Sequence, residues 1–130
     1  MKVIFCLDNN NGMMFNGRRQ SRDRLVIEDI LRNLNGNKLY IKDYSIPLFK
    51  DNEYTIFKDD TVISDNDFLF LENCDTASLG DSVTEIIIYR WNKNYPYDMT
   101  LDINLSQWKL STSEEFNGSS HHITKEIYTK

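Results

Sequence analysis

Residues 7–24 read LDNNNGMMFNGRRQSRDR. This stretch leaves an apolar run, residues 2–7, whose β-forming side chains predict a buried strand. Residues 9–12 predict a turn, because Asn and Gly tolerate positive φ. The chain then enters a helix, and Ser21 or Asp23 can cap its free N–H groups. We therefore expect a strand, a turn, an apolar loop segment and a helix, in that order.

The helix is predicted from apolar residues that recur on one helical face, and it is expected to stop at Asn35-Gly36. These apolar residues are Ile27, Ile30, Leu31 and Leu34. Beyond the helix we expect a short helical turn at 45–49, where Pro47 is tolerated. The sequence also predicts strands at 38–41, 55–57, 61–64, 68–71 and 84–91.

Residues 84–91 form an unbroken apolar run, which is typical of a strand buried on both faces of a largely parallel sheet. Strands and helices alternate up to this point, and this favours an α/β fold. The last third predicts an edge strand at 100–105 and two strands at 108–116 and 122–129. Asn117-Gly118-Ser119-Ser120 lies between these two strands and indicates a hairpin.

The composition is that of an acidic globular protein, with 40% hydrophobic residues, a net charge of −5 and a pI of about 4.9. It suits a single domain over residues 1–130. The acidic balance argues against binding of duplex nucleic acid by the whole surface. No apolar run approaches the roughly 20 residues that cross a bilayer, and the first residues do not read as a signal peptide. Cys6 and Cys74 are expected to be buried free thiols in a reducing cytoplasm.

The order of these elements, together with particular residues, resembles dihydrofolate reductase over nearly the whole chain. The matching features of the first part are Asn11-Gly12-Met13, Asp23, and the strands at 38–41, 68–71 and 86–88. Those of the last part are Trp108, the acidic-aromatic segment 114–116, the polar loop 117–121 and the strand 123–128. The resemblance implies a three-layer α/β domain with a mixed central sheet and a C-terminal antiparallel hairpin. It also implies that Asp23 is the counterpart of the acidic residue that hydrogen-bonds a pterin ring.

Two departures from this family concern its nicotinamide cofactor. The family holds the cofactor's pyrophosphate over a Gly-Gly pair at a helix N-terminus, where this chain has Glu72-Asn73. A carboxylate there would repel phosphate, and the lost glycine blocks close backbone approach. The family's Gly-Arg-x-Thr loop is replaced by residues 42–45, which lack the arginine. We therefore expect the fold and the position of the crevice to be shared, but not ordinary NADPH binding.

Four of the chain's six arginines cluster before and at the predicted helix start. They are Arg18, Arg19, Arg22 and Arg24. Cations at this end of a helix are unfavourable by roughly a few tenths of a kcal/mol each. An anion bound by the arginines and by free helix N–H groups would offset this cost. Alternatively, the loop is solvated and pairs with nearby aspartates. The partners would then be Asp8, Asp23 and Asp29.

The predicted ligand site combines the arginines with an apolar wall. Its residues are Met13, Met14, Phe15, Arg18, Arg19, Arg22 and Asp23. The arginines would hold an anionic group, the apolar residues would form one side of a slot, and Asp23 would hold a polar heterocycle. Asp23 is also the best candidate for a catalytic residue, because a carboxylate can relay a proton. Alternatively, Asp23 is a helix N-cap or an arginine partner and the apolar residues are core.

Other groups of residues give weaker signals. His121-His122 is expected to be a surface loop pair and not a metal site. Three carboxylates have a spacing that weakly resembles a magnesium site. Four aromatic residues could either stack on nucleic acid bases or pack in the core. The carboxylates are Asp8, Asp98 and Asp102, and the aromatic residues are Trp91, Tyr95, Tyr97 and Trp108. The sequence has no Gly-rich phosphate loop and no Gly-x-Ser-x-Gly elbow.

These observations favour a cytoplasmic protein that binds a small anionic or nucleotide-like ligand at the first strand-to-helix loop. One alternative is a divergent NADPH-dependent oxidoreductase that holds its cofactor differently. Another is a module that contacts a protein or RNA through the loop 18–24. The sequence leaves open whether the protein is an enzyme.

Overall fold

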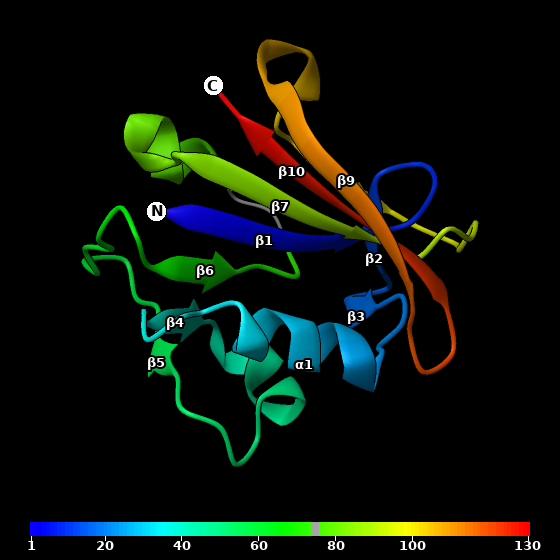
Figure 1. The fold of residues 1–130 in the computed structure, drawn as a ribbon, viewed down its shortest axis with the longest axis horizontal. Helices are drawn as coiled ribbons and strands as arrows, with labels where there is room; N and C mark the ends of the chain where they lie inside the picture. The colour runs from blue at the N-terminus through cyan, green and yellow to red at the C-terminus, as the bar shows by residue number, and fades with distance from the viewer. Residues whose placement is uncertain (74–75) are drawn as a thin grey trace.

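The computed structural model describes residues 1–73 and 76–130 of the chain, so that Cys74 lies outside the described residues. Within these residues a seven-stranded sheet has the order β5-β4-β6-β1-β7-β10-β9 (Figure 1). Its strands are β1 (Lys2–Leu7), β4 (Leu39–Ile41), β5 (Thr55–Ile56), β6 (Phe68–Phe70), β7 (Glu85–Arg90), β9 (Lys109–Asn117) and β10 (His122–Thr129). A smaller sheet joins β3 (Arg18–Arg19), β2 (Gly12–Phe15) and β8 (Met99–Thr100). The helices are α1 (Arg24–Arg32) and the 3-10 segments η1 (Asp43–Leu48), η2 (Ala77–Ser82) and η3 (Leu105–Gln107).

The large sheet is parallel from β5 to β7, and the C-terminal hairpin adds two antiparallel strands to it. β7 lies between β1, which is parallel to it, and β10, which is antiparallel. The apolar residues Ile86 to Tyr89 of β7 are buried on both faces, as the unbroken apolar run predicts. The predicted mixed sheet with a terminal hairpin is confirmed.

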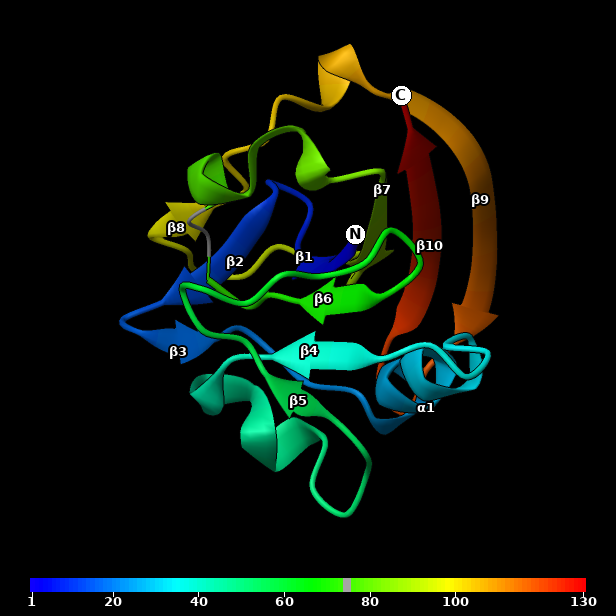
Figure 2. The ribbon, with the colours of Figure 1, turned by 90° about the vertical axis from the view of Figure 1, so that its left-hand side faces the viewer.

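Alternate residues of the strands face two separate cores. Val3 and Phe5 of β1 pack on one face together with Met13 and Met14 of β2. Ile4 packs on the other face with Val26 and Ile30 of α1 and with residues of η1. This alternation follows from the two-residue period of a strand. Figure 2 shows the resulting arrangement, with the small sheet and α1 at different sides of the central strands.

Three segments do not form the element predicted for them. Residues 61–64 form no strand, because Lys58 and Thr61 exchange hydrogen bonds in a turn, although Ile63 is buried. The predicted edge strand at 100–105 is limited to Met99–Thr100, and the chain then enters η3, where the Asn104 side chain accepts from the Ser106 N–H. Met13-Met14-Phe15 is a strand, β2, and not a loop segment.

The helical turn expected at 45–49 begins earlier, at Asp43, and it is a 3-10 helix. Ser45 does not cap it, because its hydroxyl donates a 2.8 Å hydrogen bond to Glu72. In the described residues, no helix has the length and apolar character needed to cross a membrane.

Candidate functional site

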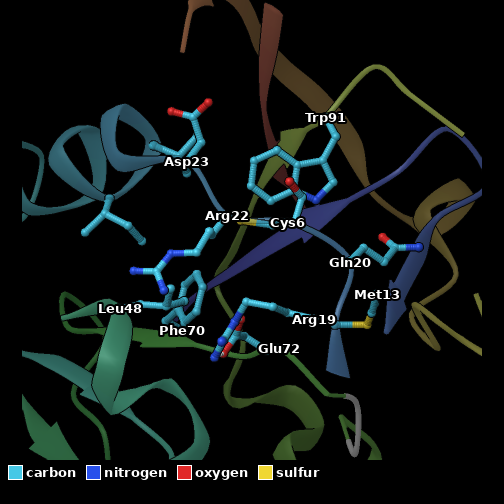
Figure 3. Close-up of a pocket in the computed structure, with 13 residues that line it drawn as sticks. Cys6, Met13, Arg19, Gln20, Arg22, Asp23, Leu48, Phe70, Glu72 and Trp91 are labelled. Atoms are coloured by element: carbon cyan, nitrogen blue, oxygen red, sulfur yellow. Dashed lines mark hydrogen bonds and ion pairs between the residues drawn. The ribbon is translucent and has the colours of Figure 1, made fainter. Parts of the chain in front are cut away.

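A narrow pocket lies beyond the carboxyl ends of the parallel strands β1 and β6, beside the N-terminus of α1 (Figure 3). The cavity itself is small, about 20 Å³, and it opens to solvent within about 390 Å³ of empty space between the lining side chains. Its apolar lining is formed by Met13, Val26, Ile27, Leu48, Phe70 and Trp91. Its polar lining is formed by Cys6, Arg19, Gln20, Ser21, Arg22, Asp23 and Glu72. This is where ligands of open α/β sheets bind.

Arg19 and Glu72 form a bidentate ion pair in the pocket wall. The Arg19 Nε donates to Glu72 Oε1 at 2.7 Å and Nη2 donates to Oε2 at 3.0 Å. The guanidinium also lies over the Tyr44 ring, 4.4 Å from its centroid. The hydrogen bond to Glu72 raises the pKa of Arg19, so its charge is fixed. The pair neutralises one of the predicted ligand-binding arginines.

The other arginines of the cluster lie apart. Arg24 pairs with Glu28 on the exposed side of α1 at 2.9 Å, and Arg18 is exposed on β3. Arg22 lines the pocket and, among the described residues, has no ion-pair partner. The loop 18–24 therefore does not present its four guanidinium groups as one patch.

The predicted pairing of these arginines with three aspartates is wrong. Asp8 accepts from the backbone N–H groups of Asn10 and Gly12 and from the Gln20 side chain. Asp29 accepts from Tyr89, Lys125 and Arg32. Asp23, the third aspartate, accepts hydrogen bonds from the loop of the C-terminal hairpin.

Asp23 is 3% exposed and caps α1, as one of its predicted roles requires. Its carboxylate accepts from the Leu25 N–H at 3.0 Å, from the Ser119 N–H at 2.7 Å and from the Ser120 N–H at 3.0 Å. Burial alone would raise the pKa of Asp23, but these hydrogen bonds and one from His121 lower it well below its usual range. Both oxygens are thus occupied by the chain itself, and Figure 3 shows them directed away from the Arg19–Glu72 pair.

His121 is a functional candidate that sequence reasoning missed. It was expected on the surface with His122, but only His122 is exposed and His121 is buried. The loop that follows β9 turns inward and places the His121 Nδ1 3.1 Å from Asp23 Oδ2. Its Nε2 lies 3.0 Å from Ser21 Oγ and 2.9 Å from the Tyr95 hydroxyl. No local signal distinguishes the two histidines, because Ser21 and Asp23 lie about a hundred residues earlier in the chain and Tyr95 lies 26 residues earlier.

The predicted apolar wall is only partly present. Met13 is buried and lines the pocket, whereas Met14 is buried in the core and Phe15 is 42% exposed at the tip of β2. Phe70 and Trp91 supply the remaining apolar surface. Of the seven predicted site residues, the pocket brings together Met13, Arg19, Arg22 and Asp23.

The other candidate groups are dispersed. Asp98 accepts from the Asn16 N–H and Asp102 from Thr76, whereas Asp8 accepts from a different set of donors. The described residues contain no group of three or more side chains that could hold a metal ion. Trp108 lies under the Lys130 ammonium, away from Trp91. Burial raises the pKa of the Cys6 thiol, so this pocket residue is protonated and a weak nucleophile.

No family model matches the sequence, and no curated protein does either. Among solved structures, the chain is similar to dihydrofolate reductase from Enterococcus faecalis complexed with NADP(H) and RAB-propyl. The two chains are 9% identical, and the match covers 98% of this chain and 94% of that one with a TM-score of 0.70. The protein therefore has a dihydrofolate-reductase-like fold, as the residues around Asn11-Gly12-Met13 and the C-terminal hairpin predict.

Proposed function

We propose that this protein binds a small molecule with an anionic group in the pocket beside α1, and that Arg22 receives this group. The main support is that Arg22 lines the pocket and has no ion-pair partner among the described residues. Of the four clustered arginines, it is the one in the described part of the chain that combines these two properties. An unpaired guanidinium at the rim of a concave site suits a carboxylate or phosphate, which it can bind with two parallel hydrogen bonds.

The surroundings of Arg22 supply room for the rest of such a ligand. Arg22 and Leu48 also line a larger groove, of about 370 Å³, that runs along α1 past Leu31 to Asn52. On the pocket side, Phe70 and Trp91 offer apolar and aromatic surface. A ligand with a flat ring and an acidic group would contact both regions, and a nucleotide is one such class.

Tryptophan fluorescence tests the proposal, because Trp91 lines the pocket and Trp108 does not. In a Trp108→Phe background the signal reports Trp91 alone. We expect a saturable change on titration with a nucleoside monophosphate or a folate, and a weaker competition by inorganic phosphate. No response to any of these probes, by fluorescence or by thermal shift, would overturn the proposal.

Two arginine variants give the matched comparison. Arg22→Gln removes the unpaired pocket charge, and we expect affinity to fall by about 10- to 100-fold, because a hydrogen bond to a charged group contributes about 1.5–3 kcal/mol. Arg18→Gln removes the same charge from the same loop but outside the pocket. Equal losses in the two variants would show a nonspecific charge effect and contradict a site at Arg22.

A further inference from the structure

Ser21, His121 and Asp23 form a hydrogen-bonded chain of hydroxyl, imidazole and carboxylate. Ser21 Oγ lies 3.0 Å from His121 Nε2, and His121 Nδ1 lies 3.1 Å from Asp23 Oδ2. Ser21 lines the pocket, whereas the side chains of His121 and Asp23 are 3% and 0% exposed behind it. Ser21 is half-buried, so of the three side chains it is the one that a ligand can reach, and the imidazole is shielded from water.

The carboxylate determines which nitrogen of His121 carries the proton. Asp23 Oδ2 and Ser120 Oγ lie 3.1 Å and 3.0 Å from His121 Nδ1, and both can accept from it. The ionised Asp23 can only accept, so Nδ1 carries the proton and Nε2 is left with a free lone pair. The Trp91 ring packs against the imidazole with 4.6 Å between ring centroids and fixes its plane. A neutral imidazole held in this tautomer can remove a proton from a hydroxyl at Nε2.

We propose that Ser21 is a nucleophile, His121 its general base and Asp23 a positioning residue, and that the pocket cleaves small esters that carry an anionic group. This inference rests on the proposed function, because Arg22 would hold the anionic group beside Ser21. Among the described residues, Arg22 is the arginine of the pocket lining without an ion-pair partner.

The reaction consumes one water and needs no other reactant. Ser21 Oγ attacks the ester carbonyl carbon while His121 Nε2 takes the hydroxyl proton, and the resulting imidazolium is stabilised by Asp23. The C–O bond to the alcohol breaks, and the alcohol leaves with that proton. Water then attacks the acyl-serine, His121 takes one of its protons, and the proton passes to Ser21 Oγ as the carboxylic acid departs. The enzyme returns to its starting state.

Tyr95 supplies a second hydroxyl to the same nitrogen, at 2.9 Å from Nε2. The single lone pair of Nε2 accepts from one donor at a time, so Tyr95 competes with Ser21 for the base. Tyr95→Phe removes the competing donor, so that Nε2 accepts from Ser21 alone. We therefore expect the reactivity of Ser21 to increase about 3- to 10-fold. A purely structural hydrogen bond from Tyr95 would give no such gain.

Covalent labelling by an uncharged fluorophosphonate, read by intact mass and peptide mapping, tests the proposal. We expect one adduct on Ser21, its loss in Ser21→Ala, and faster labelling in Tyr95→Phe. Ser119→Ala, in the hairpin loop, is the matched control and should label as the original chain does. Hydrolysis of a 4-nitrophenyl ester with a free carboxylate should be lost in Ser21→Ala.

Two variants distinguish a failure of the nucleophile at Ser21 from a failure of anion binding at Arg22. Ser21→Ala should retain binding of phosphate or nucleotide, whereas Arg22→Gln should lose that binding and still be labelled by the uncharged reagent. No adduct on Ser21 in both the original chain and Tyr95→Phe, with circular dichroism showing folded protein, would overturn the nucleophile. Equal ester hydrolysis in Ser21→Ala would overturn it as well.

Discussion

Gly118 lies directly against the Asp23 carboxylate. A Cβ at this position would overlap the carboxylate carbon and both of its oxygens. The hairpin loop can donate its Ser119 and Ser120 N–H groups to Asp23 only because residue 118 has no side chain. We expect Gly118→Ala to lower the free energy of unfolding by about 1–3 kcal/mol, as in other overpacked sites, when measured by urea denaturation.

Ser119→Ala is the control for this prediction. It keeps the backbone N–H that Asp23 accepts from and removes a side chain that is exposed. Its free energy of unfolding should stay within about 0.5 kcal/mol of the original, as for other surface substitutions. Equal losses of the free energy of unfolding for the two variants would show that the missing side chain at Gly118 is not required for the contact between the loop and Asp23.

The Asp23 carboxylate should make stability depend on pH in the acid range. Burial acts to raise its pKa, but hydrogen bonds from Ser119, Ser120 and other groups lower it below its ordinary value in the folded protein. The stability it contributes is therefore fully present above the ordinary aspartate pKa and is lost as pH falls toward the folded value. We expect Asp23→Asn to be less stable than the original by about 1–3 kcal/mol near pH 7, because an amide cannot accept all four hydrogen bonds.

The difference between Asp23→Asn and the original chain should shrink as pH falls below the ordinary aspartate pKa, because the unfolded chain then binds a proton at Asp23 while the folded carboxylate stays ionised until lower pH. Urea unfolding at several pH values measures this. Asp60→Asn, at an exposed aspartate, should follow the original chain throughout. A constant difference at all pH values would show that the ionisation of Asp23 does not stabilise the fold.

At the scale of elements, a buried ion pair ties α1 to the sheet. Asp29 of α1 accepts from the Tyr89 hydroxyl of β7 at 2.6 Å and from the Lys125 ammonium of β10 at 2.9 Å. We expect Lys125→Met to cost about 3 kcal/mol, because it leaves a buried carboxylate without this cation. Lys2→Met is the matched control, since the Lys2–Glu85 pair is longer, at 3.8 Å, and more exposed. It should cost under about 1 kcal/mol by thermal or urea unfolding.

The sequence correctly predicts the elements that have a strong local signal, either a continuous apolar run or a characteristic turn sequence. β1 and β7 are apolar runs buried on both faces, and the Asn117-Gly118 signal lies where β9 ends and the loop to β10 begins. The segment 100–105 was wrong because its apolar side chains, Leu101 and Ile103, pack into the core from a loop. Alternating apolar residues indicate which side chains are buried. A strand also needs a neighbouring strand to pair with, and the sequence of the segment alone does not show whether one is available.

At the scale of the whole molecule, the position of the pocket could be predicted but its chemistry could not. The rule that ligands bind beyond the carboxyl ends of parallel strands depends on topology, and the topology followed from the order of elements. The contacts that define the site join distant parts of the chain. His121 meets Ser21 across 100 residues, and Arg19 meets Glu72 across 53. Local patterns predict helix caps and turns, and they carry no information on which loop lies against which helix.

The pocket is balanced in charge even though the chain carries a net charge of −5. Arg19 and Arg22 oppose Glu72 and Asp23 in its lining. Distant acidic groups on the surface are screened over about 8 Å at physiological ionic strength, so the local pairs decide whether an anion is attracted. Glu72 neutralises the Arg19 guanidinium through their ion pair at 2.7 Å.

We expect Glu72→Gln to bind phosphate about 10-fold more tightly, because Arg19 then joins Arg22 as a second free cation in the pocket and tenfold corresponds to about 1.4 kcal/mol. The same variant should unfold more easily, since Glu72 also accepts from Ser45 in η1. Glu126→Gln is the matched control, because it frees Arg90 from a pair of similar length and exposure that lies outside the pocket. Both affinities follow from phosphate titration by Trp91 fluorescence. If Glu126→Gln tightens phosphate binding as much as Glu72→Gln, the gain comes from net charge, and Glu72 does not restrain Arg19.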